Sequence, residues 1–327
     1  MMKAEKMNIS HRIQNILKGA ILAPSSHNTQ PWLFEIGHSC IRLYADRTRA
    51  LPVNDPDDRE LVISCGCALM NLRVAAAREG FATEVSSPTE TDDADLLAEV
   101  QLIEGANPDP SELELFPSVE KRRTYRKRFA DREVDDATIE RLSTAATKEG
   151  ADFLVVRDQS RRKQVASLVA EGDSSQWADP SWRHELAAWM HPRRKGDGLT
   201  VPGFAAPIAR MVVRTFDMGN GVAAKDAQLA EESPVIAVIS TQRDDQTARL
   251  CVGQALERLL LTACSAGLQG SYLNQPNQVS SLRPKLQSLL DLSGFPQILL
   301  RIGYPTDEDV PSAPRRELDA VVYQRPN

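Results

Sequence analysis

A run of eight residues near the middle of the chain holds the strongest anion-binding chemistry in the sequence. Residues 121–128 read KRRTYRKR, so six of the eight side chains are basic. Guanidinium groups bind phosphate oxygens through paired hydrogen bonds, and the hydroxyl of Thr124 adds another donor. The run therefore predicts a phosphate site. A solvated basic surface and a nucleic-acid patch are the alternatives.

A second stretch, PSSHNTQPW at 24–32, has the composition of a loop that meets a ligand. Proline and short polar side chains favour turns, yet this stretch lies between an apolar helical segment and an apolar strand-like one. Its side chains offer hydroxyl and amide groups that can donate and accept hydrogen bonds. The alternative for Gln30 and Trp32 is that they simply brace the following strand, and for His27 we favour such a structural role.

The elements around these two stretches follow from apolar spacing and turn residues. We expect helices at 10–22, 58–79, 162–170 and 250–267, a capped helix that ends at Gly150, and strands at 32–36, 40–45, 99–103, 151–158, 234–241 and 297–305. Residues 104–118 are rich in Pro, Asn, Asp and Glu and predict a linker. Residues 171–231 are predicted to be irregular around one amphipathic helix, WRHELAAWMH.

Two of the apolar helices are alike in sequence. GCALMNLRVAAAREGF (66–81) and GQALERLLLTACSAGL (253–268) share six of sixteen aligned residues, including the first and fifteenth positions, which are glycine. Any two Ala/Leu helices with a glycine at the C-cap would show some likeness. The alternative is that two copies of one α+β unit are fused head to tail, which would reproduce a homodimer within one chain.

Composition limits the class of protein. The 327 residues are 42% hydrophobic with net charge −6 and five cysteines, which is ordinary for a globular protein and unusual for a nucleic-acid binder. An odd number of cysteines in so long a chain favours reduced thiols. The N-terminus lacks the apolar segment of a signal peptide, and no apolar run reaches membrane-spanning length. We expect a cytoplasmic protein without nucleic-acid or membrane partners.

Other candidate sites are weaker. Cys65 and Cys67 lack further ligands at zinc-like spacing, and His184 and His191 lack acidic neighbours in the sequence. Adjacent Ser26 and His27 do not form a catalytic triad, whose members meet from separate parts of the chain. We therefore expect no metal and name no catalytic residue.

The two polar stretches together resemble the nitroreductase superfamily of FMN-dependent oxidoreductases. PSSHNTQPW resembles its PS-x-x-N-x-QPW loop, and RRTYR at 122–126 resembles its R-x-S-x-[RK] phosphate motif. GLQGS (267–271), RIGYP (301–305) and PRREL (314–318) resemble its C-terminal half. In size and order the chain is most similar to the Acg-type subgroup. The resemblance implies an α+β, nitroreductase-like fold: an internally duplicated pseudo-dimer with mixed or antiparallel sheets flanked by helices.

The resemblance also implies one FMN with contacts from both halves. The expected contacts from the polar loop are Pro24, Ser25, Ser26, Asn28 and Gln30. The expected phosphate contacts are Arg122, Arg123, Thr124 and Arg126, with Arg315 or Arg316 closing the phosphate site from the C-terminal tail. The expected contacts at the edge of the flavin ring are Gln269, Gly270 and Ser271.

The order of the motifs implies a single composite site. Residues 1–118 form a half that keeps the polar loop but lacks the arginine motif, whereas residues 119–327 keep the motif but lack the loop. We expect the tryptophan-containing segment 171–231 to form a lid over the flavin. The chain would be a pseudo-dimeric monomer or a homodimer.

The expected activity is hydride or electron transfer through flavin N5. NAD(P)H would be the donor, and the partner would be a small electron acceptor such as a nitroaromatic or a quinone. A closed lid supports the alternative, a protein that sequesters or stores FMN without turnover. A third, purely structural protein would bind no flavin.

Overall fold

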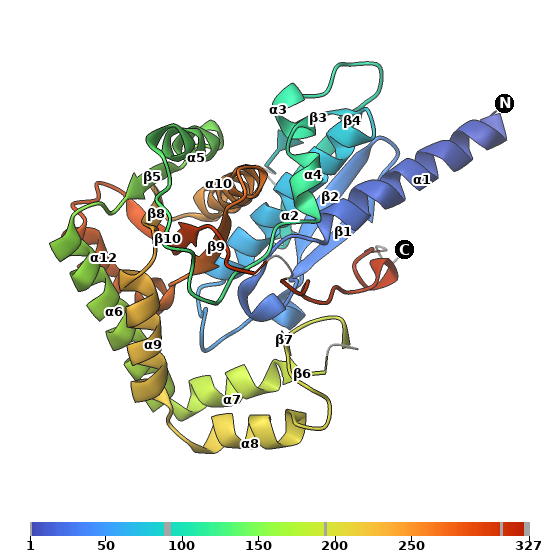
Figure 1. The fold of residues 1–327 in the computed structure, drawn as a ribbon. Helices are drawn as coiled ribbons and strands as arrows, with labels where there is room; N and C mark the ends of the chain where they lie inside the picture. Colours follow the sequence, from blue (N-terminus) through green and yellow to red (C-terminus); the bar gives the residue numbers. More distant parts are fainter. Residues whose placement is uncertain (1, 88–92, 193–194, 308–309, 324–327) are drawn as a thin grey trace.

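The computed structural model describes residues 2–87, 93–192, 195–307 and 310–323. Two four-stranded antiparallel sheets form its framework (Figure 1). The first has the order β1-β2-β4-β3 and the second β5-β8-β10-β9. The strands are β1 Trp32–Ile36, β2 Cys40–Ala45, β3 Ala82–Ser86, β4 Leu96–Ile103, β5 Asp152–Val155, β8 Val235–Thr241, β9 Gln269–Tyr272 and β10 Phe295–Gly303.

Twelve α-helices and a short pair of strands complete the described part of the chain. The helices are α1 Met2–Ala20, α2 Arg59–Arg78, α3 Pro110–Leu113, α4 Phe116–Val119, α5 Asp136–Lys148, α6 Gln159–Ala178, α7 Pro180–Ala188, α8 Ala206–Thr215, α9 Gly219–Glu231, α10 Gln246–Ser265, α11 Gln275–Gln278 and α12 Arg283–Leu289. The short strands β6 Met190–His191 and β7 Leu199–Thr200 pair in parallel. The expected α+β class with antiparallel sheets is confirmed.

The two long apolar helices α2 and α10 cross at the centre of the molecule (Figure 1). Their backbones meet at Gly66 and Gly253. A Cβ placed on Gly66 would lie 2.3 Å from the carbonyl oxygen of Leu250, and one on Gly253 would lie 2.1 Å from that of Ile63. The contacts are reciprocal, because each glycine faces the carbonyl three residues before the other. Only residues without a side chain permit this approach.

The two halves repeat one arrangement around this crossing. In each, a helix precedes two strands, a long helix packs against the first, and two further strands complete the sheet. Strands β1, β2, β3 and β4 correspond to β5, β8, β9 and β10, and the corresponding strands have the same order in both sheets. The order is consistent with the repeat predicted from the two alike helices.

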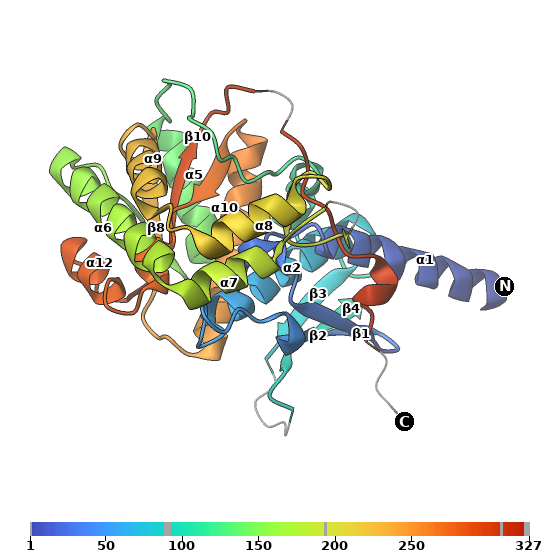
Figure 2. The same ribbon diagram turned by 90° about the horizontal axis from the view of Figure 1, so that it is seen from below.

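The prediction of irregular structure at 171–231 was wrong. This segment continues α6 to Ala178 and then forms α7, α8 and α9. The apolar residues of α6 are spread around the helix rather than along one stripe, so periodicity gives a weak signal there. The segment is inserted between β5 and β8, where the first half has only the three residues 37–39 between β1 and β2. Figure 2 shows α7 and α8 crossing in front of the central helices α2 and α10 in the view from below.

The predicted linker 104–118 contains the two short helices α3 and α4. Glu112 in α3 is buried and forms ion pairs with Arg73 of α2 and, at 3.2 Å, with Arg258 of α10. A charged residue in the sequence suggests an exposed position. Glu112 is buried because its two arginine partners come from helices that are distant in the sequence. Strand β3 was also not predicted.

The C-terminal tail returns to the first half. The backbone N–H of Phe34 in β1 donates to the carbonyl of Val321 at 2.8 Å, and Tyr323 donates back to the carbonyl of Phe34 at 2.8 Å. The tail therefore extends the first sheet although it follows the second in sequence. Its course carries Arg315 past the polar loop.

Helix α2 is long and apolar enough to resemble a membrane span by composition. However, 94% of its apolar window is buried inside the protein. Its apolarity is that of a core helix.

Candidate active site

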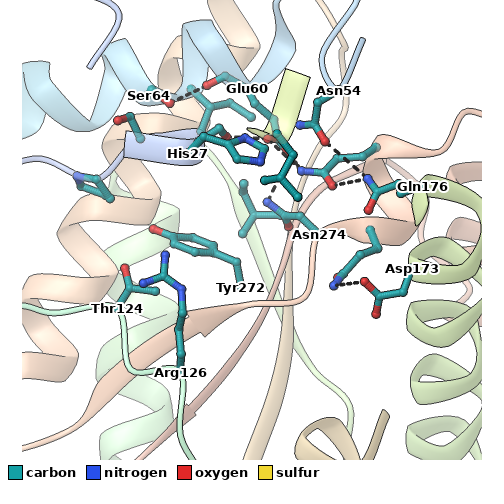
Figure 3. Close-up of a pocket in the computed structure, with 18 of the residues that line it drawn as sticks. His27, Asn54, Glu60, Ser64, Thr124, Arg126, Asp173, Gln176, Tyr272 and Asn274 are labelled. Atoms are coloured by element: carbon teal, nitrogen blue, oxygen red, sulfur yellow. Dashed lines mark hydrogen bonds between the residues drawn. The ribbon is translucent and has the colours of Figure 1, made fainter. Parts of the chain in front are cut away.

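A cavity of about 330 Å³ lies between the two halves (Figure 3). Arg126 and Thr124 lie at one side of it, and Asp173 and Gln176 lie at the other. Its size is in the range of small-molecule sites. The first half contributes Pro24, Ser25, Ser26, His27, Asn54, Glu60, Ile63, Ser64 and Cys67. The second half contributes Thr124, Arg126, Asp173, Gln176, Trp177, Trp182, Leu186, Val222, Leu256, Tyr272, Asn274, Gln275, Gln278 and Ile298.

A second cavity of about 390 Å³ adjoins the first. Four residues line both cavities: Pro24, Ser25, Thr124 and Arg126. The remaining walls are Leu22, Asn28, Val119, Glu120, Arg122, Arg123, Pro311, Ser312, Ala313 and Arg315. One long ligand could therefore occupy both cavities, with an anionic group among the arginines.

The polar loop approaches the cavities in an unusual backbone conformation. His27, Asn28 and Gln30 have positive φ values of 48°, 54° and 53°. This left-handed region suits asparagine but costs energy for most other residues. Hydrogen bonds hold it, since the N–H of Gln30 donates to Ser25 Oγ at 2.9 Å, and Asn28 Nδ2 donates to the carbonyl of Pro314 at 3.1 Å.

The loop is tied to α2 through Glu60. Ser26 Oγ donates to Glu60 Oε2 at 2.5 Å, and the side-chain amides of Gln278 and Asn274 donate to the same carboxylate at 3.0 and 3.3 Å. Glu60 is buried and lines the first cavity. Both halves are thus joined by hydrogen bonds at the cavity wall.

Arg122 reaches the second cavity but already has a partner. Its Nε lies 3.2 Å from Oε1 of Glu257, a fully buried residue of α10. One of its terminal nitrogens, Nη2, donates to the carbonyl of Leu22 at 3.1 Å. Burial raises the pKa of Glu257 to about 7, with Arg122 and Arg315 opposing the shift. Removing Arg122 would leave a buried carboxyl without its cation.

Arg126 is the contrasting case. Its side chain lines both cavities, and in the first cavity it lies beside Thr124 (Figure 3). It forms no hydrogen bond or ion pair with any residue that the structure describes, and burial lowers its pKa. A cation in this position is free to bind a ligand.

The second cavity has an excess of positive charge. Its walls contain four arginines and one glutamate, Glu120. Burial, and then repulsion from Arg122, lowers the pKa of Arg315 to about 9. The same two causes lower the pKa of Arg123. An anion in this cavity would relieve that repulsion.

Gln30 and Arg316 have bracing contacts instead of cavity contacts. Gln30 Nε2 donates to the carbonyl of Gly196 at 2.9 Å, and its Oε1 accepts from the backbone N–H of Arg316 at 2.9 Å. Arg316 also pairs with Asp46 at 3.2 Å. Both residues fasten the loop, the C-terminal tail and the inserted segment to one another.

Gln269, Gly270 and Ser271 lie in β9 and outside the walls of both cavities. Gln269 Oε1 accepts from the backbone N–H of Arg123 at 2.8 Å, and the carbonyl of Gly270 accepts from Tyr125 at 2.9 Å. Gln269 and Gly270 thus hold the arginine motif in place. Roles of these three residues toward a flavin stay a prediction.

The structure thus brings nine of the predicted residues into the cavity walls: Pro24, Ser25, Ser26, Asn28, Arg122, Arg123, Thr124, Arg126 and Arg315. Sequence reasoning missed Glu60, Asp173, Tyr272 and the polar run that begins at Asn274. The run NQPNQ directly after a strand could have indicated the last of these. Nothing in the sequence marks Glu60 or Asp173, because each lies within a long helix.

His27, for which a structural role was favoured, lines the first cavity. Burial is the main cause that lowers its pKa to about 4. Its imidazole is therefore neutral at pH 7, and its Nδ1 is buried without a hydrogen-bond partner in the described structure.

Comparisons with known proteins point in one direction. Residues 119–304 match the model of the nitroreductase family. A Mycobacterium tuberculosis (strain ATCC 25618 / H37Rv) protein that bears the name of an NAD(P)H nitroreductase, Rv3131, is 30% identical over 318 residues, which cover 95% of this chain and 90% of the relative. The Acg protein of the same organism, also named as an NAD(P)H nitroreductase, is 26% identical over 318 residues and 96% of each chain.

Solved structures show weaker likeness. The NADPH:FMN oxidoreductase of Vibrio harveyi complexed with NAD+ has a TM-score of 0.42 at 14% identity, covering 65% of this chain and 77% of that one. A BluB-like flavoprotein of Clostridium difficile 630 has a TM-score of 0.42 at 16% identity, covering 64% and 97%. Scores this low carry no argument about function.

Proposed function

Because this chain belongs to the nitroreductase family, we propose that it is an FMN-dependent oxidoreductase. Its donor is NAD(P)H, and its acceptor is a small molecule such as a nitroaromatic or a quinone. When bound, FMN supplies a ring that accepts hydride at N5 and passes it on. The family and the names of its relatives support the oxidoreductase class. The cofactor and the acceptor are our proposal.

One observation carries the proposal: the two adjoining cavities differ in character in the way that the two ends of FMN do. The larger one is rimmed by arginines, which suit a phosphate. The smaller one has mixed walls, in which aromatic and aliphatic side chains such as Trp177, Leu256 and Ile298 lie beside many hydroxyl, amide and carboxyl groups. Such a lining suits a flat ring whose edge carries polar atoms. Arg126 and Thr124 stand where the two meet.

The residues present fit the cofactor. Arg122, Arg123 and Arg315 would face the phosphate, and the hydroxyl of Thr124 would add a donor. Arg126, which has no partner in the described structure, would complete the charge balance. Short side chains at Ser25 and Ser26 leave room for a ligand to approach the loop backbone. The chain's own part is to bind and orient the ring and to exclude water from it.

The site combines the two halves. The polar loop and α2 come from residues 1–118, while the arginine motif, β9, α11 and the tail come from residues 119–327. We propose that each chain binds one FMN, which is consistent with a pseudo-dimeric monomer. All five cysteines are free thiols, and burial raises the pKa of each. This supports a reducing, cytoplasmic setting.

The inserted segment 171–231 supports the second candidate function, sequestration of FMN. Its side chains Asp173, Trp177, Trp182 and Val222 wall the first cavity. At its far end the N–H of Gly198 donates to the carbonyl of Asn28 at 3.1 Å. We propose that the segment is a lid. A lid that stays closed would exclude NAD(P)H.

The deciding experiment is an anaerobic spectral titration of the purified protein. The proposal expects a yellow protein whose flavin absorbance is bleached by NAD(P)H and restored by a quinone or nitroaromatic. A yellow protein that NAD(P)H leaves unchanged would favour sequestration. A colourless protein that takes up no added FMN would refute both.

A further inference from the structure

A buried carboxyl, Asp173, and a half-buried one, Asp226, meet at the side of the first cavity that lies away from the arginines. Asp173 comes from α6 and Asp226 from α9. The amide Nε2 of Gln275 bridges them, donating to Asp173 Oδ1 at 3.1 Å and to Asp226 Oδ2 at 3.0 Å. Asp173 lines the cavity (Figure 3).

Asp173 is built to hold a proton. Asp173 is only 3% exposed. Its second carboxyl oxygen, Oδ2, is buried without a hydrogen-bond partner in the described structure. A buried carboxylate without a partner is costly, and protonation removes the charge. Burial, and then the charge of Asp226, raises the pKa of Asp173 to about 7.

The surrounding charges favour Asp173 as the protonated member of the pair. On β10 and α9, Arg301 and Lys225 oppose the rise in the pKa of Asp226. The neighbour of Asp173 on α11 is the neutral Gln275, so Asp173 has only an uncharged amide to oppose the rise in its pKa. Glu171, on the same helix as Asp173, pairs with Lys285 of α12. Both of these side chains are half exposed, so this ion pair lies at the surface.

We propose that Asp173 is the proton donor to the electron acceptor. This inference rests on the proposed function. A quinone that receives a hydride gains two electrons and one hydrogen, and it needs one further proton on its other oxygen to become a hydroquinone. The O–H bond of the Asp173 carboxyl breaks as the new O–H bond forms. The carboxylate then takes a proton from solvent.

The walls beside Asp173 define the class of acceptor. Trp177 and Trp182 stand edge to face with ring centroids 5.5 Å apart, and Leu186 and Val222 lie in the same cavity wall. An apolar surface of this kind suits a planar, uncharged aromatic ring. The carboxyl pair disfavours an anionic acceptor.

The test compares Asp173→Asn with wild type and with Glu171→Gln, a surface control on the same helix. Each FMN-loaded protein is reduced with dithionite and mixed with p-benzoquinone or with ferricyanide, which takes an electron and no proton. We expect Asp173→Asn to slow reoxidation by the quinone about a hundredfold. The wild-type rate should fall between pH 6 and pH 8 as Asp173 loses its proton, and the rate of Asp173→Asn should not. Reoxidation by ferricyanide stays unchanged.

A second readout needs no flavin. Thermal unfolding of the apoprotein is followed from pH 4 to pH 8. Folded wild type keeps the Asp173 proton that the unfolded chain loses above pH 4, so its melting temperature should fall relative to that of Asp173→Asn as pH rises to about 7. A constant difference between the two proteins at every pH would overturn the proposal.

The two ideas fail in different ways. A wild-type protein that binds no FMN refutes the proposed function and this inference with it. FMN-loaded Asp173→Asn that reduces the quinone as fast as wild type refutes only the inference. The same holds if the substitution slows the quinone and ferricyanide reactions equally.

Discussion

Arg126 is the residue at which the cofactor assignment can be tested without damage to the fold. It has no partner in the described structure, so Arg126→Ala removes only what it gives to a ligand. A charged hydrogen bond contributes about 1.5–3 kcal/mol. We therefore expect FMN to bind roughly 10- to 100-fold more weakly, measured by quenching of its fluorescence, with an unchanged melting temperature.

Arg128→Ala is the matched control. Arg128 lies two residues further along the same run, but its side chain is 64% exposed and pairs with Glu232 at 2.8 Å. It should leave FMN affinity unchanged. Equal dissociation constants for wild type and Arg126→Ala would contradict the assignment.

Glu257 gives the apoprotein a pH dependence of its own. Its pKa rises from 4.5 to about 7 on folding. Between these values the unfolded chain loses a proton that the folded chain keeps, so the free energy of unfolding falls as pH rises and levels off above 7. The free energy of unfolding of Glu257→Gln, relative to that of wild type, should therefore increase by about 3 kcal/mol between pH 4 and pH 8. Urea unfolding at the two pH values measures this, and a difference that does not change with pH would count against it.

At this scale the sequence predicted the residues that belong to short motifs. Ser25, Ser26, Thr124 and Arg126 line cavities as their types suggest. Glu60 and Asp173 could not be found, because their roles depend on partners that are distant in the sequence, such as Gln278 for Glu60 and Gln275 for Asp173. The buried pairing of Arg122 with Glu257 is equally invisible in a linear sequence.

At the scale of elements, the crossing of α2 and α10 requires glycine. A Cβ at position 66 would lie 2.3 Å from the carbonyl oxygen of Leu250, and overpacking of this kind typically costs about 1–3 kcal/mol. We expect Gly66→Ala to lower the melting temperature. Gly221→Ala is the control, since nothing lies within 4 Å of its Cβ and alanine should stabilise α9 by up to about 1 kcal/mol. Two variants of equal stability would contradict the close crossing.

The proposed lid is fastened at its far end by charge. Asp197 pairs with Arg49, and its Oδ1 lies 3.2 Å from Nε2 of His191. Burial lowers the pKa of His191, so the charged contact of Asp197 is the one with Arg49. We expect Asp197→Asn to release bound FMN about tenfold faster, measured by fluorescence recovery on dilution. Glu231→Gln, at an exposed position of α9, should release it at the wild-type rate. Unchanged release from Asp197→Asn would contradict a lid held closed here.

Elements with clear periodicity were predictable, including α2, α10, β8 and β10. The extent of the helices at 171–231 was not predictable. These helices bury polar as well as apolar residues against one another and against the cavity, so no apolar stripe marks them in the sequence. The return of the tail to β1 was also beyond prediction, since a single strand-like contact at Val321 and Val322 carries no pattern of its own.

At the scale of the whole molecule, we propose that duplication leaves one site. Eleven residues (21–31) separate α1 from β1, and they include the polar loop. Only three residues (149–151) separate α5 from β5 in the second half. Glu149 is buried there in ion pairs with Arg73 at 2.7 Å and Arg258 at 2.6 Å. We infer that this short connection leaves the second half without a counterpart of the polar loop.

The most direct test of the central claim is an equilibrium titration of the apoprotein with FMN that gives the number of molecules bound per chain. The account predicts one FMN per chain, with the affinity reduced in Arg126→Ala and retained in Arg128→Ala. No saturable binding, or binding at a ratio of two, would contradict a single site shared by the two halves.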